Sequence, residues 1–289
     1  MILVTGATGK TGRHLTGELV RRGAPVRALV RNPAAAKAVL GDEVQIVAGD
    51  LDRPDTLEAA MSHVELLYLL APPSPRLAEV EAGAIEAARR AGVRRIVKHS
   101  AIDAGSAARS SIARMHATSE RMLAASGLDH TILRGSMFMQ NFLLFAESIA
   151  VDGEIRAPMR NGRCAFVDCA DLAAVAAAVL TEAGHRGRTY VVTGPEALSA
   201  ADAAARLSSA LSRPIRYVDC PVQEATAILR GQGSPEWMIA DMLASIETFA
   251  AGEIDEVTDV VERVAGRSPR TFATFARDAA PLLAARVPS

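Results

Sequence analysis

The first 135 residues alternate short, continuously apolar runs with longer amphipathic stretches. The apolar runs are too short and too uniformly apolar for surface helices, so they predict buried strands of a parallel sheet. We expect such strands at Met1–Thr5, Val26–Val30, Val44–Ala48, Leu66–Ala71, Arg95–Lys98 and Thr131–Leu133. The amphipathic stretches predict helices at Gly12–Arg22, Asp55–Met61, Glu79–Ala91 and Ser110–Ser126.

This alternation of strand and helix predicts βαβ units, and hence an α/β fold with a doubly wound parallel sheet of the Rossmann type. Beyond residue 135 the alternation loosens. There we expect helices at Phe138–Ala150 and Cys169–Ala183, strands at Thr189–Thr193 and Ile215–Val218, and mostly helix from Val222 to Gly252.

The domain organisation follows from the same pattern. We expect a nucleotide-binding core over residues 1–135, to which segments near 165–195 return. Residues 136–289 are expected to form mostly a smaller C-terminal α/β substrate lobe over the strand ends of the core, together with C-terminal helices.

Composition excludes several function classes. The chain has a net charge of −1, so no global field attracts nucleic acid or an anionic membrane. No apolar run approaches the roughly 18 residues of a membrane span, and the N-terminus does not look like a secretory signal. The three cysteines, Cys164, Cys169 and Cys220, show no close pairing. We therefore expect reduced thiols, no metal site and a cytoplasmic location.

A glycine-rich turn follows the first predicted strand and opens the first helix. Its residues are Gly6, Ala7, Thr8, Gly9, Lys10, Thr11 and Gly12. In such a turn the glycines permit a tight bend, a close approach of backbone N–H groups to a pyrophosphate, and close packing of the helix. The phosphate loop of nucleoside triphosphatases is excluded, because that motif requires a glycine where this chain has Val4.

Arg31 ends the second predicted strand, at the position where NAD-preferring folds place an acidic side chain. An arginine pairs with the 2′-phosphate of NADP, whereas a carboxylate would repel it. We therefore expect NADP(H) as the cofactor, with Lys37 and Lys10 as further cations for its phosphates. The alternative is that Arg31 is simply a solvated strand-end residue.

Two other strand ends are expected at the same cofactor cleft, because ligands of open α/β sheets bind at the carboxyl ends of the strands. Asp50 and Leu51 follow the third strand, and an aspartate there can accept a hydrogen bond from the adenine amino group. Ala71, Pro72 and Pro73 follow the fourth strand, where proline lets a flat ring approach. Asp50 can equally cap the next segment.

With these residues the chain resembles the NmrA-like branch of the atypical short-chain dehydrogenases/reductases, and within it the type 2 NAD(P)H:quinone oxidoreductases and triphenylmethane reductases. The match includes the glycine turn, Arg31-Asn32-Pro33, Val97–Ser100, His116–Glu120, Ser126–Arg134, Phe138–Phe142, Phe166–Asp168 with Asp171, Tyr190–Gly194, and Gly266-Arg267 before Pro269–Phe272. The resemblance implies a Rossmann domain with a substrate lobe. We expect Ser100, Phe138 and Asn141 to contact the cofactor. Arg134-Gly135-Ser136 departs from the Arg-Pro-Gly of many relatives and weakens inference about the substrate.

The Tyr-x-x-x-Lys pair of typical short-chain dehydrogenases is missing. None of Tyr68, Tyr190 and Tyr217 has a lysine four positions later, and Lys98 is the last lysine of the chain. In its place stands His116 with Glu120 one helical turn on. A glutamate beside a histidine holds its tautomer and raises its pKa, which suits a weak proton donor or a substrate clamp. The alternative is that Glu120 is a structural helix residue and His116 merely lines the pocket.

Without a strong acid, a simple ketone is a poor hydride acceptor, whereas a quinone or another conjugated acceptor gives a delocalised product on reduction. We expect such an acceptor between the strand ends and the lobe. Phe138, Phe142, Phe166 and Trp237 are candidate aromatic walls of its pocket, with Asn141 as a polar contact. Ordinary core packing is the alternative for each aromatic residue.

Two functional hypotheses follow. The first is an NADPH-dependent reductase of a small conjugated acceptor, acting as a monomer or homodimer. The second is a non-catalytic NADP(H)-binding redox sensor of the NmrA type, which suits the same loss of the tyrosine–lysine pair. An epimerase or dehydratase of nucleotide sugars ranks lower, because it also needs that pair.

Overall fold

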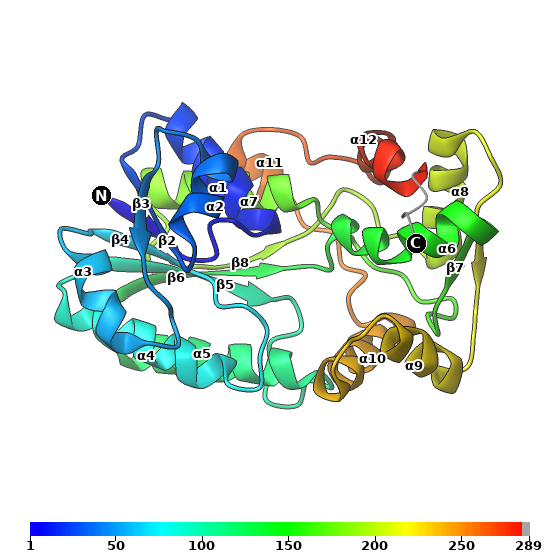
Figure 1. Cartoon of the computed structure of the whole chain (residues 1–289), viewed down its shortest axis with the longest axis horizontal. Coiled ribbons are helices and arrows are strands. Elements are labelled where there is room, and N and C mark those ends of the chain that lie inside the picture. Colours follow the sequence, from blue (N-terminus) through cyan, green and yellow to red (C-terminus); the bar gives the residue numbers. More distant parts are fainter. Residues whose placement is uncertain (285–289) are drawn as a thin grey trace. The chain divides into compact units, whose positions relative to one another are not determined.

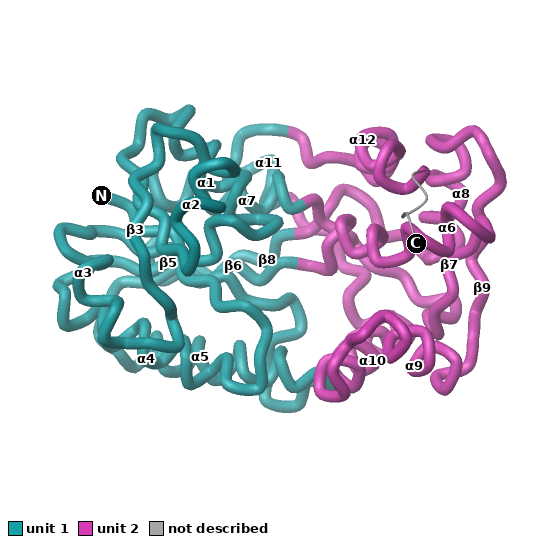
Figure 2. Tube along the Cα trace, viewed as in Figure 1, with its two compact units in different colours: residues 1–135, 169–192, 260–267 teal, residues 136–168, 193–259, 268–289 magenta. Residues whose placement is uncertain are grey.

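A computed structural model describes residues 1–284 of the chain, which divide into two compact units (Figure 2). Unit 1 comprises Met1–Gly135, Cys169–Val192 and Val260–Arg267. Unit 2 comprises Ser136–Asp168, Thr193–Asp259 and the chain from Ser268 onward. The chain therefore passes between the units several times, and Val260–Arg267 joins unit 1, a return that the sequence pattern did not indicate.

Unit 1 is built on a seven-stranded sheet with the order β3-β2-β1-β4-β5-β6-β8, and every strand pair is parallel. The strands are β1 (Ile2–Val4), β2 (Val26–Val30), β3 (Gln45–Ala48), β4 (Leu66–Leu69), β5 (Arg95–Ala101), β6 (Asp129–Gly135) and β8 (Thr189–Val192). The strand order reverses at β1, as it does in dinucleotide-binding sheets. The expected Rossmann-type α/β fold is confirmed.

Helices cover both faces of this sheet (Figure 1). One face carries α1 (Lys10–Arg21), α2 (Pro33–Leu40), α7 (Cys169–Thr181) and α11 (Val260–Ala265). The other face carries the short helix η1 (Pro54–Thr56) with α3 (Leu57–Met61), α4 (Leu77–Arg90) and α5 (Ser111–Ala125). All residues of α7 except Ala170 and Thr181 are buried, and their small side chains let α1 and α11 pack closely against this helix.

The strand boundaries differ from the sequence expectation where polar residues lie inside the sheet. β5 continues beyond Lys98 through His99 and Ser100 to Ala101. The polar side chains of Lys98, His99 and Ser100 are all buried. An apolar run cannot reveal such a strand end. Helix α2 was not predicted either, because Ala36 is its only buried residue. The helix begins after Asn32, whose side chain accepts a hydrogen bond from the Ala35 N–H.

Unit 2 combines one small parallel pair, β7 (Glu154–Arg156) with β9 (Arg216–Val218), and several helices. The helical elements are η2 (Met139–Phe145), α6 (Ala146–Asp152), α8 (Ala200–Leu211), α9 (Val222–Gly231), α10 (Glu236–Ala250) and α12 (Phe272–Ala284). The helix expected over Phe138–Ala150 is thus a 3₁₀ segment followed by a short α-helix. β7, α8 and α12 were not predicted from the sequence.

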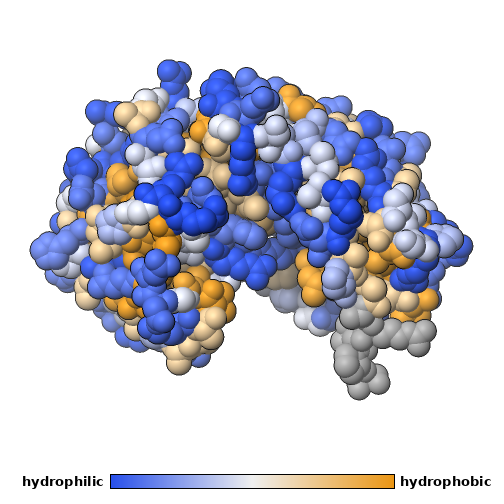
Figure 3. Space-filling view, turned by 90° about the horizontal axis from the view of Figure 1, so that it is seen from above, coloured by the Kyte–Doolittle hydropathy of each residue, from blue (hydrophilic) through white to orange (hydrophobic). Residues whose placement is uncertain are grey.

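The face in Figure 3 is predominantly hydrophilic, with hydrophobic residues in small scattered groups. Within residues 1–284, no helix is both long enough and apolar enough to cross a membrane.

Candidate functional site

The glycine turn after β1 is held by backbone contacts that leave no room for side chains. Gly6 has a φ of +63°, which favours glycine, and its carbonyl accepts a hydrogen bond from the Gly9 N–H at 3.0 Å. A Cβ on Gly12 would lie 2.1 Å from the Gly6 carbonyl oxygen. The third glycine of the motif therefore lets α1 begin directly against the turn, as the sequence predicted for close helix packing.

The N-terminus of α1 is free to bind an anion. Gly9 is the N-cap residue, no side chain caps the helix, and the first turn contains no acidic residue. Gly9 is exposed, and the Gly6 carbonyl is the nearest neighbour that its Cβ would meet. Free amide N–H groups at the positive end of a helix dipole fit the diphosphate of a dinucleotide.

Exposed cations surround this turn. The side chains of Lys10 and Arg13, on the first turn of α1, and of Arg31, directly after β2, make no ion pair with any residue from 1 to 284. Arg13 was not singled out from the sequence, although its place on the first turn of α1 was a usable signal. Lys37, expected as a further phosphate ligand, instead forms an ion pair with Asp42 at 2.5 Å.

The ends of β3 and β4 carry further residues that were expected to contact the cofactor. One carboxylate oxygen of Asp50 accepts a hydrogen bond from the Asp52 N–H at 3.1 Å, so this residue does cap the following turn. The side chains of Leu51 and Ala71 are buried in the hydrophobic core of unit 1. Pro72 and Pro73 are exposed directly after β4. The contact of these residues with adenosine stays a prediction.

A buried polar cluster lies on β5, α4 and α5. The Lys98 ammonium donates hydrogen bonds to Glu81 Oε1 at 2.9 Å and to the His99 carbonyl at 2.8 Å, and it lies 3.1 Å from His116 Nδ1. Lys98 and Glu81 are both fully buried. Glu81 Oε2 also lies 2.8 Å from Lys98 Nζ, so the ion pair engages both carboxylate oxygens.

Glu120 contacts Ser100 and Arg134 and makes no hydrogen bond to His116. Its carboxylate accepts hydrogen bonds from Ser100 Oγ at 2.6 Å and from Arg134 Nε at 3.0 Å. The expectation that Glu120 orients His116 and raises its pKa is therefore wrong. Burial, followed by the charge of Lys98, holds the pKa of His116 well below its usual range. Ser100, assigned to the cofactor, already donates its hydroxyl to Glu120.

His99 lies beside this cluster. Its Nδ1 is 2.7 Å from the hydroxyl of Tyr68, which is also buried. Burial and the neighbouring Lys98 lower the pKa of His99 to about 3. Both histidines are therefore neutral in the folded protein at mildly acidic pH.

We expect acidification to destabilise the protein through these two histidines. In the unfolded chain they bind protons near pH 6.5, whereas in the folded protein they do not until much lower pH. The stability is present above about pH 6.5 and decreases as the pH falls, by about 1 kcal/mol for each histidine between pH 6.5 and 5.5. Denaturant unfolding at the two pH values measures this, and His116→Gln should remove about half of the loss. An unchanged loss in that variant would contradict the assignment.

Two of the candidate aromatic residues are part of the core of unit 2. Phe142 is 2% exposed and packs against Phe166 and Phe272, and Phe166 is 3% exposed and also packs against Phe249. Their burial among these rings favours the alternative of ordinary core packing for both residues. Phe138, Asn141 and Trp237 are half-buried and keep some exposed surface.

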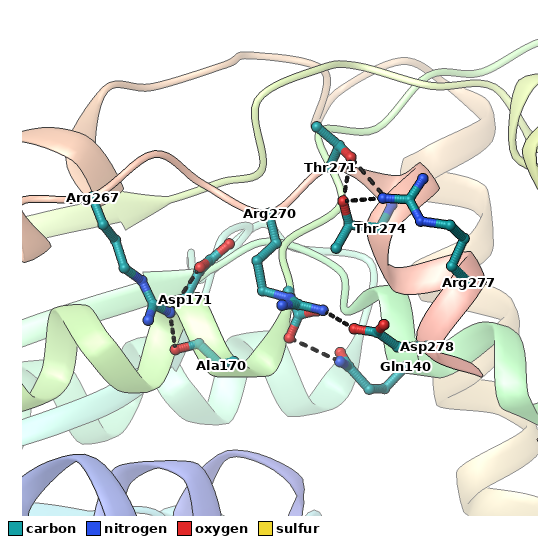
Figure 4. Close-up of polar contacts among 10 residues, drawn as sticks. Gln140, Ala170, Asp171, Arg267, Arg270, Thr271, Thr274, Arg277 and Asp278 are labelled. Atoms are coloured by element: carbon teal, nitrogen blue, oxygen red, sulfur yellow. Dashed lines mark hydrogen bonds and ion pairs between the residues drawn. The ribbon is translucent and has the colours of Figure 1, made fainter. Parts of the chain in front are cut away.

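Arg267 and Arg270, near the C-terminus, each form an ion pair that joins two segments of the same unit (Figure 4). In unit 1, Arg267 donates to the fully buried Asp171 at 2.9 Å and joins α11 to α7. In unit 2, Arg270 donates to Asp168 at 2.9 Å, and Gln140 donates to the same carboxylate at 3.0 Å. Arg267 and Arg270 therefore each have carboxylate partners within their own unit.

The parallel sheet, its reversal at β1 and the uncapped helix behind a glycine turn define a dinucleotide-binding protein. A family model described as NAD(P)H-binding matches residues 6–183. The chain belongs to this NAD(P)H-binding family, and the expected NmrA-like relationship is confirmed.

Three relatives illustrate this relationship. The NAD(P)H azoreductase of Xenophilus azovorans is 38% identical over 96% of this chain and 97% of its own length. The crystal structure of the NADPH-dependent quinone oxidoreductase QOR2 of Escherichia coli with NADPH matches with a TM-score of 0.87 and 30% identity, over 96% of this chain and 99% of that one. The triphenylmethane reductase of Citrobacter sp. with NADP(H) matches with a TM-score of 0.87 and 25% identity, over 97% and 100%.

Proposed function

We propose that the protein is an NADPH-dependent reductase that transfers a hydride to a quinone or a similarly conjugated small acceptor. The observation that carries this proposal is that the glycine turn and Arg31 lie at the same edge of the sheet. The glycine turn follows β1 and the exposed Arg31 follows the neighbouring strand β2, whose carboxyl end lies at the same edge.

The cofactor is held by the residues at this edge. The N–H groups at the start of α1 bind the diphosphate, and Arg31 binds the 2′-phosphate that distinguishes NADP from NAD. Lys10 and Arg13 add positive charge beside them. The bound reduced nicotinamide supplies the hydride, and this chain supplies binding and orientation.

The chemical class of the acceptor follows from the missing proton donor of this chain. No tyrosine is followed by a lysine four positions later, so the proton donor of typical short-chain dehydrogenases is missing. A conjugated acceptor spreads the charge of its reduced form and needs no strong acid. The relatives are named for azo compounds, quinones and triphenylmethane dyes, all of which are conjugated.

The direct test is turnover. Purified protein is mixed with NADPH and a series of quinones and azo compounds, with a simple aliphatic ketone as the matched control, and the nicotinamide absorbance is followed. We expect steady oxidation with the conjugated acceptors and none with the ketone. Binding of NADPH without turnover would favour the redox-sensor hypothesis instead.

Arg31→Ala should discriminate between the two nicotinamide cofactors. Loss of a charge-assisted contact to the 2′-phosphate is expected to weaken NADPH binding by about 1.5–3 kcal/mol, or roughly 10- to 150-fold, with little change for NADH. Calorimetric titration of the wild type and the variant with both cofactors measures this. Arg21→Ala, at the other end of α1, is the control. An equal loss for NADPH and NADH would contradict the assignment.

A further inference from the structure

We propose that Lys98 is a positioning residue that fixes His116 as the neutral tautomer with its proton on Nε2. His116 then offers a ligand a hydrogen-bond donor and does not act as an acid. The part of this inference that concerns the acceptor rests on the proposed function. The part that concerns the tautomer rests on the buried cluster alone.

The hydrogen-bond geometry around Lys98 determines where the proton of His116 lies. An ammonium group has three N–H donors and no acceptor. Its three hydrogen-bond partners here are Glu81 Oε1 at 2.9 Å, the His99 carbonyl at 2.8 Å and His116 Nδ1 at 3.1 Å. Glu81 Oε2 lies 2.8 Å from the same nitrogen as part of the ion pair but makes no hydrogen bond. Since the first two partners can only accept, the third N–H points to His116 Nδ1. That nitrogen therefore carries the lone pair, and the ring proton lies on Nε2.

The reverse arrangement would require a neutral lysine that accepts from a protonated Nδ1. It is disfavoured because Glu81 is fully buried and both of its oxygens lie within 2.9 Å of Lys98 Nζ. A neutral Lys98 would leave this carboxylate buried beside an uncharged amine, and an uncompensated buried charge is costly. Burial lowers the pKa of Lys98, and the charge of Glu81 opposes that change.

The charged groups around His116 also oppose a second proton on the ring. From β5 come the Lys98 ammonium and His99, and both lower the pKa of His116 in addition to its burial. Glu81 of α4 is paired with Lys98. Glu120, one turn along α5, is paired with Arg134 of β6. No carboxylate is therefore left to stabilise an imidazolium at this position.

The second ring nitrogen, Nε2, is the part of His116 that remains for a ligand. It makes no hydrogen bond to any residue in the described part of the chain, and His116 keeps an exposed fraction of 7%. An N–H donor here stabilises negative charge that develops on an acceptor oxygen or nitrogen. Hydride addition to a neutral quinone or azo compound gives an anion, and the proton that completes its reduction then comes from water. His116 keeps its own proton throughout.

Nitrogen NMR of the imidazole rings tests the tautomer without any cofactor. The chain has six histidines, and the signals of His116 are assigned by their loss in His116→Gln. Long-range proton–nitrogen correlations of the free protein should show a neutral Nε2–H ring at His116 from about pH 5.5 to 8. A ring protonated at Nδ1, or a ring that titrates within this range, would overturn the proposal.

A double variant tests the role of Lys98. Lys98→Met with Glu81→Gln removes both buried charges together, which avoids an unpaired carboxylate. We expect its His116 ring to become a mixture of both tautomers and to titrate at higher pH. Lys37→Met, on an exposed ion pair, should leave the His116 signals unchanged. A pure Nε2–H ring in the double variant would show that Lys98 does not set the tautomer. If the double variant does not fold, the wild-type spectra still decide which tautomer His116 adopts.

Activity measurements separate this inference from the proposed function. The turnover number of the wild type should be independent of pH from about pH 5.5 to 8, because His116 does not titrate there. His116→Gln, whose amide retains an N–H donor, should keep more activity than His116→Phe. A protein with the Nε2–H ring but no turnover would contradict the proposed function alone. A reductase with an Nδ1–H ring would contradict this inference alone.

Discussion

Gly12→Ala is expected to lower the affinity for NADPH by at least about 100-fold. A Cβ at this position would lie 2.1 Å from the Gly6 carbonyl oxygen and 2.7 Å from Ala7 Cα, and both are backbone atoms that cannot move aside cheaply. The start of α1 must shift away from the turn, so the N–H groups that face the diphosphate lose their alignment. Each charge-assisted hydrogen bond contributes about 1.5–3 kcal/mol, and a displaced turn weakens more than one. Calorimetric titration with NADPH measures the loss.

Gly17→Ala is the matched control on the same helix. No atom lies within 4 Å of a Cβ at Gly17, and the residue is exposed in the interior of α1. This change should leave NADPH binding unaffected and stabilise the fold by about 0.5–1 kcal/mol, because alanine loses less backbone entropy than glycine. Wild-type affinity in Gly12→Ala would contradict the assignment of the turn to the diphosphate.

Lys98→Met is expected to cost about 3–5 kcal/mol of the free energy of unfolding. The change leaves the Glu81 carboxylate buried without its partner, and breaking a buried ion pair from one side is strongly destabilising. It also removes the donors that Lys98 directs to the His99 carbonyl and to His116 Nδ1. Denaturant unfolding of the wild type and the variant under the same conditions measures the difference.

Two further variants identify the source of this loss. Adding Glu81→Gln to Lys98→Met removes the uncompensated charge and should restore part of the stability. Lys37→Met breaks an exposed ion pair with Asp42 and should have little effect. A loss in Lys98→Met no larger than that in Lys37→Met would show that the buried pair does not stabilise the fold.

The sequence predicted the cofactor-binding half of the molecule well, because the signals there are local. β1 is fully apolar, and β2 is apolar except for Arg27; the observed bounds of both strands agree with the expected runs within a residue or two. The glycine turn lies where a strand meets a helix, and this context together with the glycine spacing predicts a diphosphate site. The place of Arg31 could be predicted as well, because it requires only that the end of β2 is predicted correctly.

The buried polar cluster could not be predicted in the same way. Helical spacing shows that His116 and Glu120 share one face of α5, and on that basis they were expected to interact. Each has a stronger partner on another element, Lys98 of β5 for His116 and Arg134 of β6 for Glu120. Local spacing cannot reveal such competitors, since sheet pairing brings them together over long sequence distances.

The aromatic residues show the same limit for packing. Phe142 and Phe166 are separated by 24 positions, yet their rings lie 5.2 Å apart between centroids in the core of unit 2. A sequence pattern does not distinguish a core ring from one that faces a ligand. The return of Val260–Arg267 to unit 1 was missed for a related reason, because α11 is too short to show a periodic pattern.

A single-turnover experiment tests the central claim of hydride transfer from bound NADPH most directly. Protein loaded with a slight deficit of NADPH is mixed rapidly with excess quinone, and the nicotinamide absorbance is recorded. The account predicts that the absorbance of bound NADPH decays completely, at a rate well above that of NADPH and quinone mixed without protein. Bound NADPH that persists at the protein-free rate would contradict the claim.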